Sequence, residues 1–342
     1  MKNPPKPFQD YSQLVERLID LGMKVDDREK AEKALRCFGY HRLGGYRYIF
    51  RQLLPKEEQN EANRKFRRDN FINGTNFNDV MKYYEFDVEL RQILLNGLFD
   101  FEIRFRAAIA HILAKRNPMA HLDKNCLDKN KCDEITKRNN KTKFEAWKSE
   151  YKKALNHSKD EDFIIHYINT YSKEKLPVWA TVELLSFGNL PYLFGLLKQS
   201  DQNAVARYFG IKNGRNLLKW SLALSNLRNN CAHNIRVFNK NVKYKIKINS
   251  SAIINNELLT HIIEEKVSDI KIYRHCAVLA YLLLSHENGT IWNLKLAKHI
   301  NNFPLIYLNE KIPITSSESS MGFPKQWQKL KIWNISQLHN VQ

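Results

Sequence analysis

Hydrophobic side chains recur at helical spacing along most of this chain. Residues 78–115 carry the longest such pattern, which ends before Pro118 because proline cannot continue a helical hydrogen-bond ladder. Its apolar positions are 90, 93, 94, 98, 101, 105, 108, 109 and 112. Residues 215–233 show a second regular stripe with steps of three and four. The stripe consists of Leu217, Trp220, Leu224, Leu227 and Cys231. Both segments are therefore predicted to be amphipathic helices with one buried face.

Other segments add shorter elements. Residues 9–37 predict two short amphipathic helices, and residues 38–48 form an aromatic, glycine-broken corner. Pro177 opens a further helical stretch, and helical spacing returns at 258–284. In between, apolar residues alternate with lysines from 242 to 248, which is typical of a strand. The expected fold is mainly α, with a small β element near 241–249.

Charge is the strongest compositional signal. The 342 residues include 55 Lys and Arg against 36 Asp and Glu, a formal net charge of +19. Such an excess favours a polyanionic partner, either nucleic acid or an anionic membrane surface. The longest apolar run, residues 276–284, is about half of the ~20 residues that a membrane span needs. Nucleic acid is therefore the favoured partner, with no membrane partner expected.

The termini and cysteines point to a compartment. Residues 1–5 are not followed by the apolar stretch of a signal peptide. The five cysteines are odd in number and scattered, which does not fit a disulfide framework. A reducing, cytoplasmic location is expected.

An arginine followed by a histidine five positions later occurs four times, whereas random placement predicts roughly 0.6 such pairs. The pairs are Arg36/His41, Arg106/His111, Arg116/His121 and Arg228/His233. Histidine moves protons near neutral pH, and arginine stabilises charge on phosphate oxygens. Gly39 interrupts the first pair and Pro118 the third, so only the other two fall inside long predicted helices.

Helix geometry limits what one pair can do. Five residues span about 7.5 Å of rise and about 140° of rotation, so Arg228 and His233 do not share a face. Asn229 lies one turn before His233 and could orient its imidazole. Both groups could address one phosphate only in a cleft, whose opposite wall Arg106 and His111 could supply. In the alternative reading, Arg228 and Arg106 pair with carboxylates, the latter with Glu102, and His233 caps its helix.

Two further groups of residues are candidates for binding. Four lysines at or near the predicted strand could bind the phosphates of an RNA backbone, or they could form the solvent-exposed face of the strand. They are Lys240, Lys243, Lys245 and Lys247. A zinc site would need His121, Cys126, Cys132 and His157, whose spacing fits no common pattern. No metal or other cofactor is therefore expected.

Six segments, taken in order, resemble one known family. They are residues 39–46, 84–91, 102–111, 177–190, 227–234 and 321–324. The chain resembles the AbiD/AbiF-type abortive-infection proteins, anti-phage proteins of the HEPN superfamily. Arg228, Asn229 and His233 match the family's Arg-polar-x-x-x-His motif. Arg106 and His111 match its arginine and histidine, but Ala107 departs from its polar position.

The resemblance implies a HEPN-like helical bundle with metal-independent, toxin-like endoribonuclease activity, in which a 2′-hydroxyl attacks the adjacent phosphate. The catalytic candidates are then Arg228, Asn229, His233, Arg106 and His111. The implied organisation is an N-terminal helical region (1–75), two HEPN-like halves (76–200 and 201–290) and a C-terminal extension (291–342). The first half contains a lysine-rich insertion near 123–160, and the two halves could be pseudo-symmetric.

The resemblance also sets the expected partners: an RNA substrate and, as in some members, a small structured regulatory RNA. The site could be composite within a monomer or shared in a homodimer. The main alternative is a non-catalytic RNA-binding protein on a HEPN scaffold. A third reading is an interaction module whose basic face docks an acidic protein.

Overall fold

The computed structural model describes residues 7–63, 65–136, 140–171, 175–285, 291–308 and 311–334. Within these ranges the chain forms fifteen α-helices and two short strands. Some stretches of the predicted domains lie outside the described residues. They include residues 1–6, for which no signal peptide was expected, residues 137–139 of the lysine-rich insertion, and residues 335–342 of the C-terminal extension. The predicted mainly α fold is confirmed.

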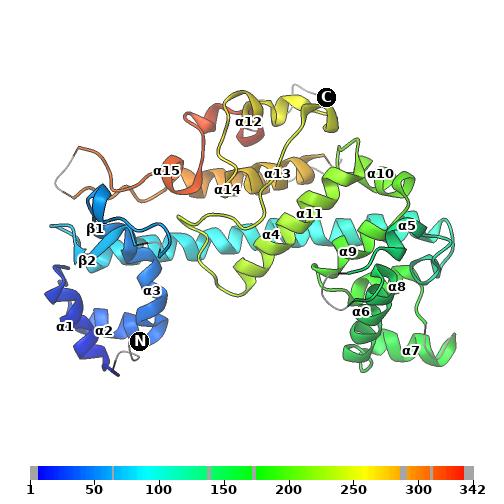
Figure 1. Ribbon diagram of the computed structural model, residues 1–342, viewed down its shortest axis with the longest axis horizontal. Coiled ribbons are helices and arrows are strands. Elements are labelled where there is room, and N and C mark those ends of the chain that lie inside the picture. The colour runs from blue at the N-terminus through cyan, green and yellow to red at the C-terminus, as the bar shows by residue number, and fades with distance from the viewer. Residues whose placement is uncertain are drawn as a thin grey trace.

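Helix α4 (Phe77–Ala114) is the spine of the molecule and runs along its longest axis (Figure 1). The side chain of Asn76 caps its N-terminus by accepting a hydrogen bond from the backbone N–H of Asn78 at 2.8 Å. The apolar stripe seen in the sequence is buried along the helix, and helices from every part of the chain pack on it.

The N-terminal elements gather at one end of α4 (Figure 1). They are α1 (Tyr11–Asp20), α2 (Arg28–Phe38), α3 (Tyr40–Arg47) and the antiparallel hairpin of β1 (Arg51–Leu53) and β2 (Arg67–Phe71). Gly39, with a φ of +82°, separates α2 from α3. The positive φ suits glycine, which has no Cβ to clash there.

A second group lies at the other end of α4, and it projects to the same side as the N-terminal helices (Figure 1). It consists of α5 (Lys129–Asp133), α6 (Lys143–His157), α7 (Asp162–Thr170), α8 (Val178–Leu184) and α9 (Asn189–Leu196). Pro177 caps α8, as the sequence indicates.

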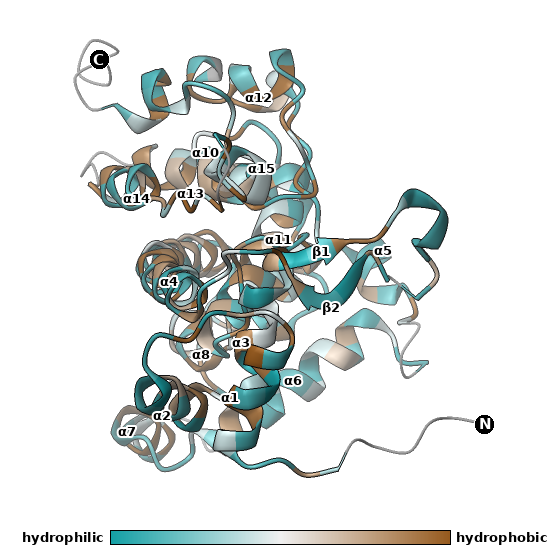
Figure 2. Cartoon of the chain, turned by 90° about the vertical axis from the view of Figure 1, so that its left-hand side faces the viewer, coloured by the Kyte–Doolittle hydropathy of each residue, from teal (hydrophilic) through white to brown (hydrophobic). Residues whose placement is uncertain are grey.

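The remaining helices are α10 (Gln199–Arg207), α11 (Gly214–Ala232), α12 (Thr260–Glu264), α13 (Tyr273–Leu284), α14 (Trp292–Asn301) and α15 (Ser317–Met321). Of these, α10, α11, α13 and α14 pack on α4. Figure 2, seen nearly along α4, shows α13 and α14 as a layer on one side of it. Short 3-10 turns link the elements at Tyr48–Phe50, Lys56–Glu58, Ala120–Leu122, Ser250–Ala252, Asn256–Leu258, Trp327–Lys329 and Lys331–Trp333.

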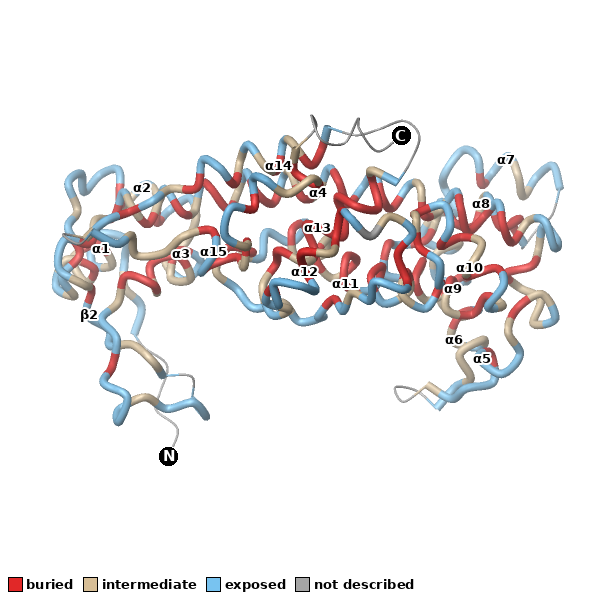
Figure 3. The backbone as a smooth tube through the Cα atoms, turned by 90° about the horizontal axis from the view of Figure 1, so that it is seen from above, coloured by how far each residue is buried: buried red, intermediate tan, exposed pale blue. Residues whose placement is uncertain are grey.

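One hydrophobic core joins these groups. Its buried side chains come from the N-terminal helices, from α4 and from the segments that follow it as far as Trp333. Burial concentrates along the long axis, while both ends carry exposed loops (Figure 3). At one close contact, Trp292 packs on Gly97, where a Cβ would come within 2.4 Å of the indole. None of the helices in the described ranges has the length and apolarity of a membrane span.

The β element predicted near 241–249 is wrong: these residues form no strand. Ile246 is buried, but no second strand lies beside the segment. Side chains bind its carbonyl groups instead: the Trp220 indole donates to the Lys247 oxygen at 3.1 Å, and Arg274 donates to the Ile246 oxygen at 3.0 Å. Ile246 is therefore buried without a sheet, whereas Tyr244, two residues earlier in the alternating pattern, is exposed.

Buried neutral histidines make the stability of this fold depend on pH. Burial lowers the pKa of His121 to about 3 and those of His261 and His275 to about 4, from an ordinary 6.5. Only the unfolded chain gains these protons as the pH falls from 7 to 5. The free energy of unfolding should then fall by up to about 1.4 kcal/mol per pH unit for each histidine.

Urea unfolding at pH 7, 6 and 5 measures this loss. The variant His166→Gln, at an exposed position, should show the same pH dependence as the parent chain. An unfolding free energy that stays constant over this range would contradict the prediction.

Candidate functional site

Helix α11 lies against the middle of α4 (Figure 1). The stripe predicted from the sequence is its buried face: Leu217, Trp220, Leu224, Leu227 and Cys231 are all at most 5% exposed. This packing sets the rotation of the helix and therefore the direction of Arg228, which lies next to the stripe and faces α4.

The two predicted arginines meet at one carboxylate. Arg228 donates to both Glu102 oxygens, with Nη2 to Oε2 at 3.2 Å and Nη2 to Oε1 at 3.4 Å. Arg106 donates to the same carboxylate from one turn along α4, and also to the carbonyl oxygen of Val182. Glu102 is only 5% exposed. The carboxylate pairing considered for both arginines is thus present, and it joins them in one Arg–Glu–Arg cluster.

This cluster carries an excess of positive charge, since two guanidinium groups share one carboxylate. Arg228 also lies over the Phe187 ring, with its central carbon 6.0 Å from the ring centroid. Its side chain remains 23% exposed, against 12% for Arg106. An anion that approaches from solvent would reach Arg228 first, with Arg106 and Glu102 behind it.

His233 is the C-cap residue of α11, which agrees with the alternative interpretation that this histidine caps its helix. Its backbone N–H donates to the Asn229 oxygen at 3.0 Å, and Asn234 then turns the chain with a φ of +54°. The side chain is exposed, and no group in the described ranges hydrogen-bonds to its imidazole. The Asn229 side chain instead accepts from Arg228 at 3.2 Å, so the expected contact between Asn229 and His233 is not made.

His111 lies away from the cluster. It is exposed near the end of α4, where it lines a cavity of about 440 Å³ together with Arg104, Ala107, Ala108, Tyr208 and Phe209. Arg106 and His111 are about 140° apart around the helix, so they face different neighbours. The structure therefore brings Arg106, but not His111, to Arg228.

A second buried carboxylate, which the sequence reading missed, anchors the segment after α11. Asp87 on α4 accepts from the backbone N–H groups of Val237 at 3.1 Å and Phe238 at 2.7 Å. It also accepts from the Tyr46 hydroxyl at 2.6 Å and pairs with Arg91. The available signal was an aspartate within the apolar stripe of α4, where a charge must find partners.

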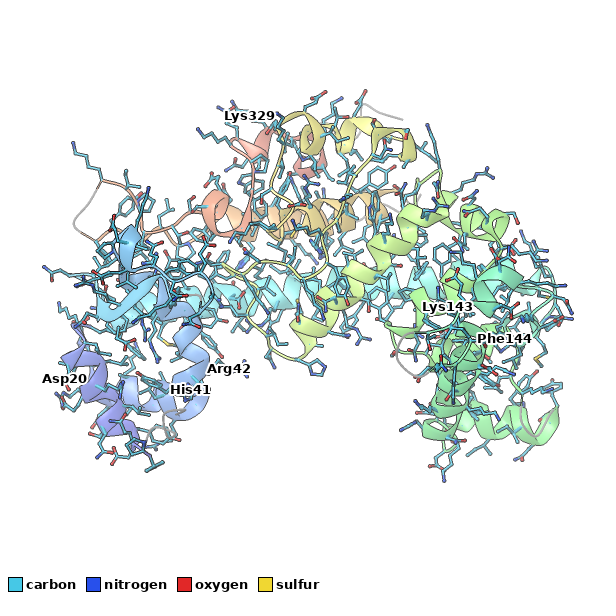
Figure 4. The ribbon with its side chains drawn as sticks, in the orientation of Figure 1. Asp20, His41, Arg42, Lys143, Phe144 and Lys329 are labelled. Carbon is cyan, nitrogen blue, oxygen red and sulfur yellow. The ribbon has the colours of Figure 1, made fainter. Side chains whose placement is uncertain are left out.

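Helix α3 also contacts the turn beside His233. Arg42 donates to the carbonyl oxygen of Asn234 at 2.8 Å. Figure 4 labels Arg42 and His41 on α3. The N-terminal helices thus help to fix the turn on which His233 lies.

The other two arginine–histidine pairs are separated. Arg36 and His41 lie in different helices, on either side of Gly39. Arg116 binds Asp201 at 2.6 Å, whereas His121 is buried and its Nε2 lies 3.0 Å from the Thr181 hydroxyl. Arg116 and His121 are thus engaged in separate contacts, and the residues of neither pair lie on one helix.

The alternative zinc site is not assembled. The Nε2 of His121 already has a hydroxyl partner, and burial holds the pKa of its imidazole near 3. In the described ranges, no three His, Cys, Asp or Glu side chains lie close enough together to hold a metal.

The four candidate lysines have different surroundings. Lys245 pairs with Asp269 at 3.2 Å, and Lys247 is exposed. Lys240 and Lys243 line a larger cavity beside α11. Cys231, inside the motif, is buried with its pKa raised to about 12 by desolvation, so its thiol is not a nucleophile.

The protein is mainly helical, and one buried ionic cluster joins its two longest helices, α4 and α11. The sequence model described as Abi-like protein matches residues 33–239, more than half of the chain, and covers α4, α11 and the turn after it. The chain belongs to the Abi-like protein family and has a role in abortive infection. No curated protein and no solved structure matches it.

The cluster should be important for stability. Glu102→Gln leaves two partly buried arginines without their carboxylate, so the free energy of unfolding should fall by about 3–5 kcal/mol. Chemical denaturation measures the loss. Glu85→Gln, at an exposed position on the same helix, is the matched control and should change the value by less than about 0.5 kcal/mol. Equal effects of the two substitutions would contradict a structural role of Glu102.

Proposed function

We propose that this protein is a metal-independent endoribonuclease of the HEPN type that acts in abortive infection by cleaving RNA. The observation that carries the proposal is that Arg228 of α11 and Arg106 of α4 converge on Glu102, while the exposed His233 lies at the C-terminal end of α11. The cluster holds a partly exposed guanidinium in a fixed place, and His233 supplies a group that can exchange a proton.

In the proposed reaction, the 2′-hydroxyl of one nucleotide attacks the adjacent phosphorus. The new bond closes a 2′,3′-cyclic phosphate, and the bond to the 5′-oxygen of the next nucleotide breaks. His233 moves a proton, either from the attacking hydroxyl or to the leaving oxygen. Arg228 stabilises the charge that develops on the phosphate oxygens. Arg106 and Glu102 position Arg228, and Asn229 helps through its contact with that guanidinium.

Such a reaction uses both a base and an acid, and His111 faces elsewhere. We propose that His233 of a second copy provides the second proton-transfer group in a homodimer. The exposed position of His233 at the end of α11 would allow a partner to approach.

A non-catalytic RNA-binding protein remains the second candidate. The observation that favours it is that Glu102 engages both arginines in this structure and thereby occupies donors that a phosphate would need. The net charge of +19 would then contribute to RNA binding and not to cleavage.

Cleavage of single-stranded RNA in EDTA tests the proposal. His233→Ala should lower the rate about 10²- to 10⁴-fold through loss of proton transfer. Arg228→Ala should lower it about 10²- to 10³-fold through loss of charge stabilisation. The exposed residues His166 and Arg215 give the matched controls His166→Ala and Arg215→Ala, which should cut at the parent rate. Unaltered cutting by both site variants, or a need for divalent metal, would refute the mechanism.

Growth of cells that overproduce the protein separates the two candidates. A nuclease should be toxic, and His233→Ala should abolish the toxicity at equal protein levels. Toxicity that persists in His233→Ala would argue for binding without cleavage.

A further inference from the structure

A large cavity with a mixed polar and apolar lining lies on the other side of α11 from Arg228. Its volume is about 770 Å³, within the range of sites that hold small ligands. Its walls come from α11, the segment after it and the connection between β1 and β2. We call it the α11 cavity. Its polar lining consists of Asn226, Asn230, Asn241, Arg236, Lys240 and Lys243, with Glu61 as the one carboxylate.

The charge of the lining suits an anion. Three cations face one exposed carboxylate, which leaves a formal excess of two positive charges. Lys240 and Lys243 have no ion-pair partner in the described ranges. Lys243 lies near the Tyr244 ring, 5.4 Å from its centroid.

Arg236 is held in place more firmly than the lysines. It donates to the carbonyl oxygen of Asn239 at 3.2 Å and lies over the Tyr46 ring, 6.0 Å from its centroid. Gly45 makes room for it, because a Cβ there would lie 3.0 Å from the Arg236 Nε. Burial lowers the pKa of its guanidinium, although the charge of Asp87 acts in the opposite direction, and no carboxylate forms an ion pair with it in the described ranges. A preorganised cation of this kind is well suited to bind a phosphate.

The amides give the cavity a second chemistry. Asn226 and Asn230 lie one turn apart on α11, and the Asn230 Nδ2 donates to the Asn226 Oδ1 at 3.5 Å. Asn241 adds a third amide from the opposite wall. Amides both donate and accept, as base edges do, and the apolar part of the lining can pack on a base. That apolar part consists of Phe66, Leu227, Val237, Val242 and Ile272.

The cavity also lies close to the proposed chemistry. On an ideal helix, Asn230 and His233 are about 4.5 Å apart along the axis and about 60° apart around it. Arg228 is about 160° from Asn230. The end of α11 that bears His233 is therefore bordered by the Arg–Glu–Arg cluster on one side and the α11 cavity on the other.

We propose that the α11 cavity binds one nucleotide of the RNA strand next to the phosphate that is cut. Its three cations bind the phosphate of that nucleotide, and its three amides contact the edge of the base. This subsite would give the enzyme a base preference. The inference rests on the proposed function in taking RNA as the ligand.

Binding of labelled single-stranded RNA octamers (A8, C8, G8 and U8) tests the subsite. All proteins carry His233→Ala, so that binding is measured without cleavage. Lys240→Gln/Lys243→Gln should weaken binding about tenfold and lower the slope of log Kd against log salt by up to about 0.7, because the three cations bind one phosphate. Lys212→Gln/Lys219→Gln removes the same charge at exposed positions elsewhere and should leave that slope unchanged.

A second variant keeps the charge and probes base recognition. Asn226→Ala/Asn230→Ala should change the relative affinities for the four octamers at least about threefold, with the salt slope unchanged. Equal weakening and equal slopes for both lysine double variants, with an unaltered order of octamers in the asparagine variant, would overturn the subsite.

The outcomes also separate this inference from the proposed function. Selective loss of binding in the cavity variants of a protein that never cuts RNA would support the subsite and refute the nuclease. A protein that cuts RNA, and whose cavity variants bind and cut like the controls, would keep the nuclease and refute the subsite.

Discussion

A carboxylate that is buried must find positive charge or hydrogen-bond donors, and α4 buries two of them. Glu102 holds Arg228 of α11, and Asp87 holds the backbone of Val237 and Phe238 just beyond that helix. The two carboxylates lie fifteen residues apart on α4, about 22 Å along its axis. Glu102 fixes the position at which α11 crosses α4, and Asp87 fixes the path of the segment that follows α11. The candidate site therefore depends on both carboxylates.

This arrangement explains why the site forms at the end of a helix. The apolar stripe of α11 sets its rotation, the pairing with Glu102 directs Arg228 toward α4, and the anchoring by Asp87 stabilises the turn that exposes His233. Arg42 of α3 donates to this turn directly, and Tyr46 of α3 donates to Asp87. The matched region, residues 33–239, contains all of these residues. The Arg–Glu–Arg cluster serves structure and proposed chemistry at once, because the groups that hold the helices together also orient the guanidinium.

The sequence predicted the features that depend on local periodicity. The stripes of α4 and α11, the helical class and the separation of the Arg36/His41 and Arg116/His121 pairs all follow from spacing, Gly39 and Pro118. Features that depend on tertiary partners were harder to predict. The segment 241–249 alternates like a strand, but no strand pairs with it: the side chains of Trp220 and Arg274 bind two of its carbonyl groups, and the Val242 N–H donates to the Ile270 carbonyl oxygen. His111 shares the spacing of the motif, yet its side chain lies away from Arg228. Asp87 was missed because its partners, such as Phe238, are far from it in the sequence.

The central claim is that Arg228, supported by Glu102 and Arg106, binds the phosphate that His233 helps to cleave. A crystal structure of the protein with an RNA octamer whose 2′-hydroxyl groups are replaced by hydrogen tests it most directly, because such a strand binds without being cut. The account predicts a phosphate oxygen within hydrogen-bond distance of the Arg228 guanidinium, with the His233 imidazole beside the 2′-carbon or the 5′-oxygen. A strand bound elsewhere, with Arg228 donating only to Glu102, would contradict it.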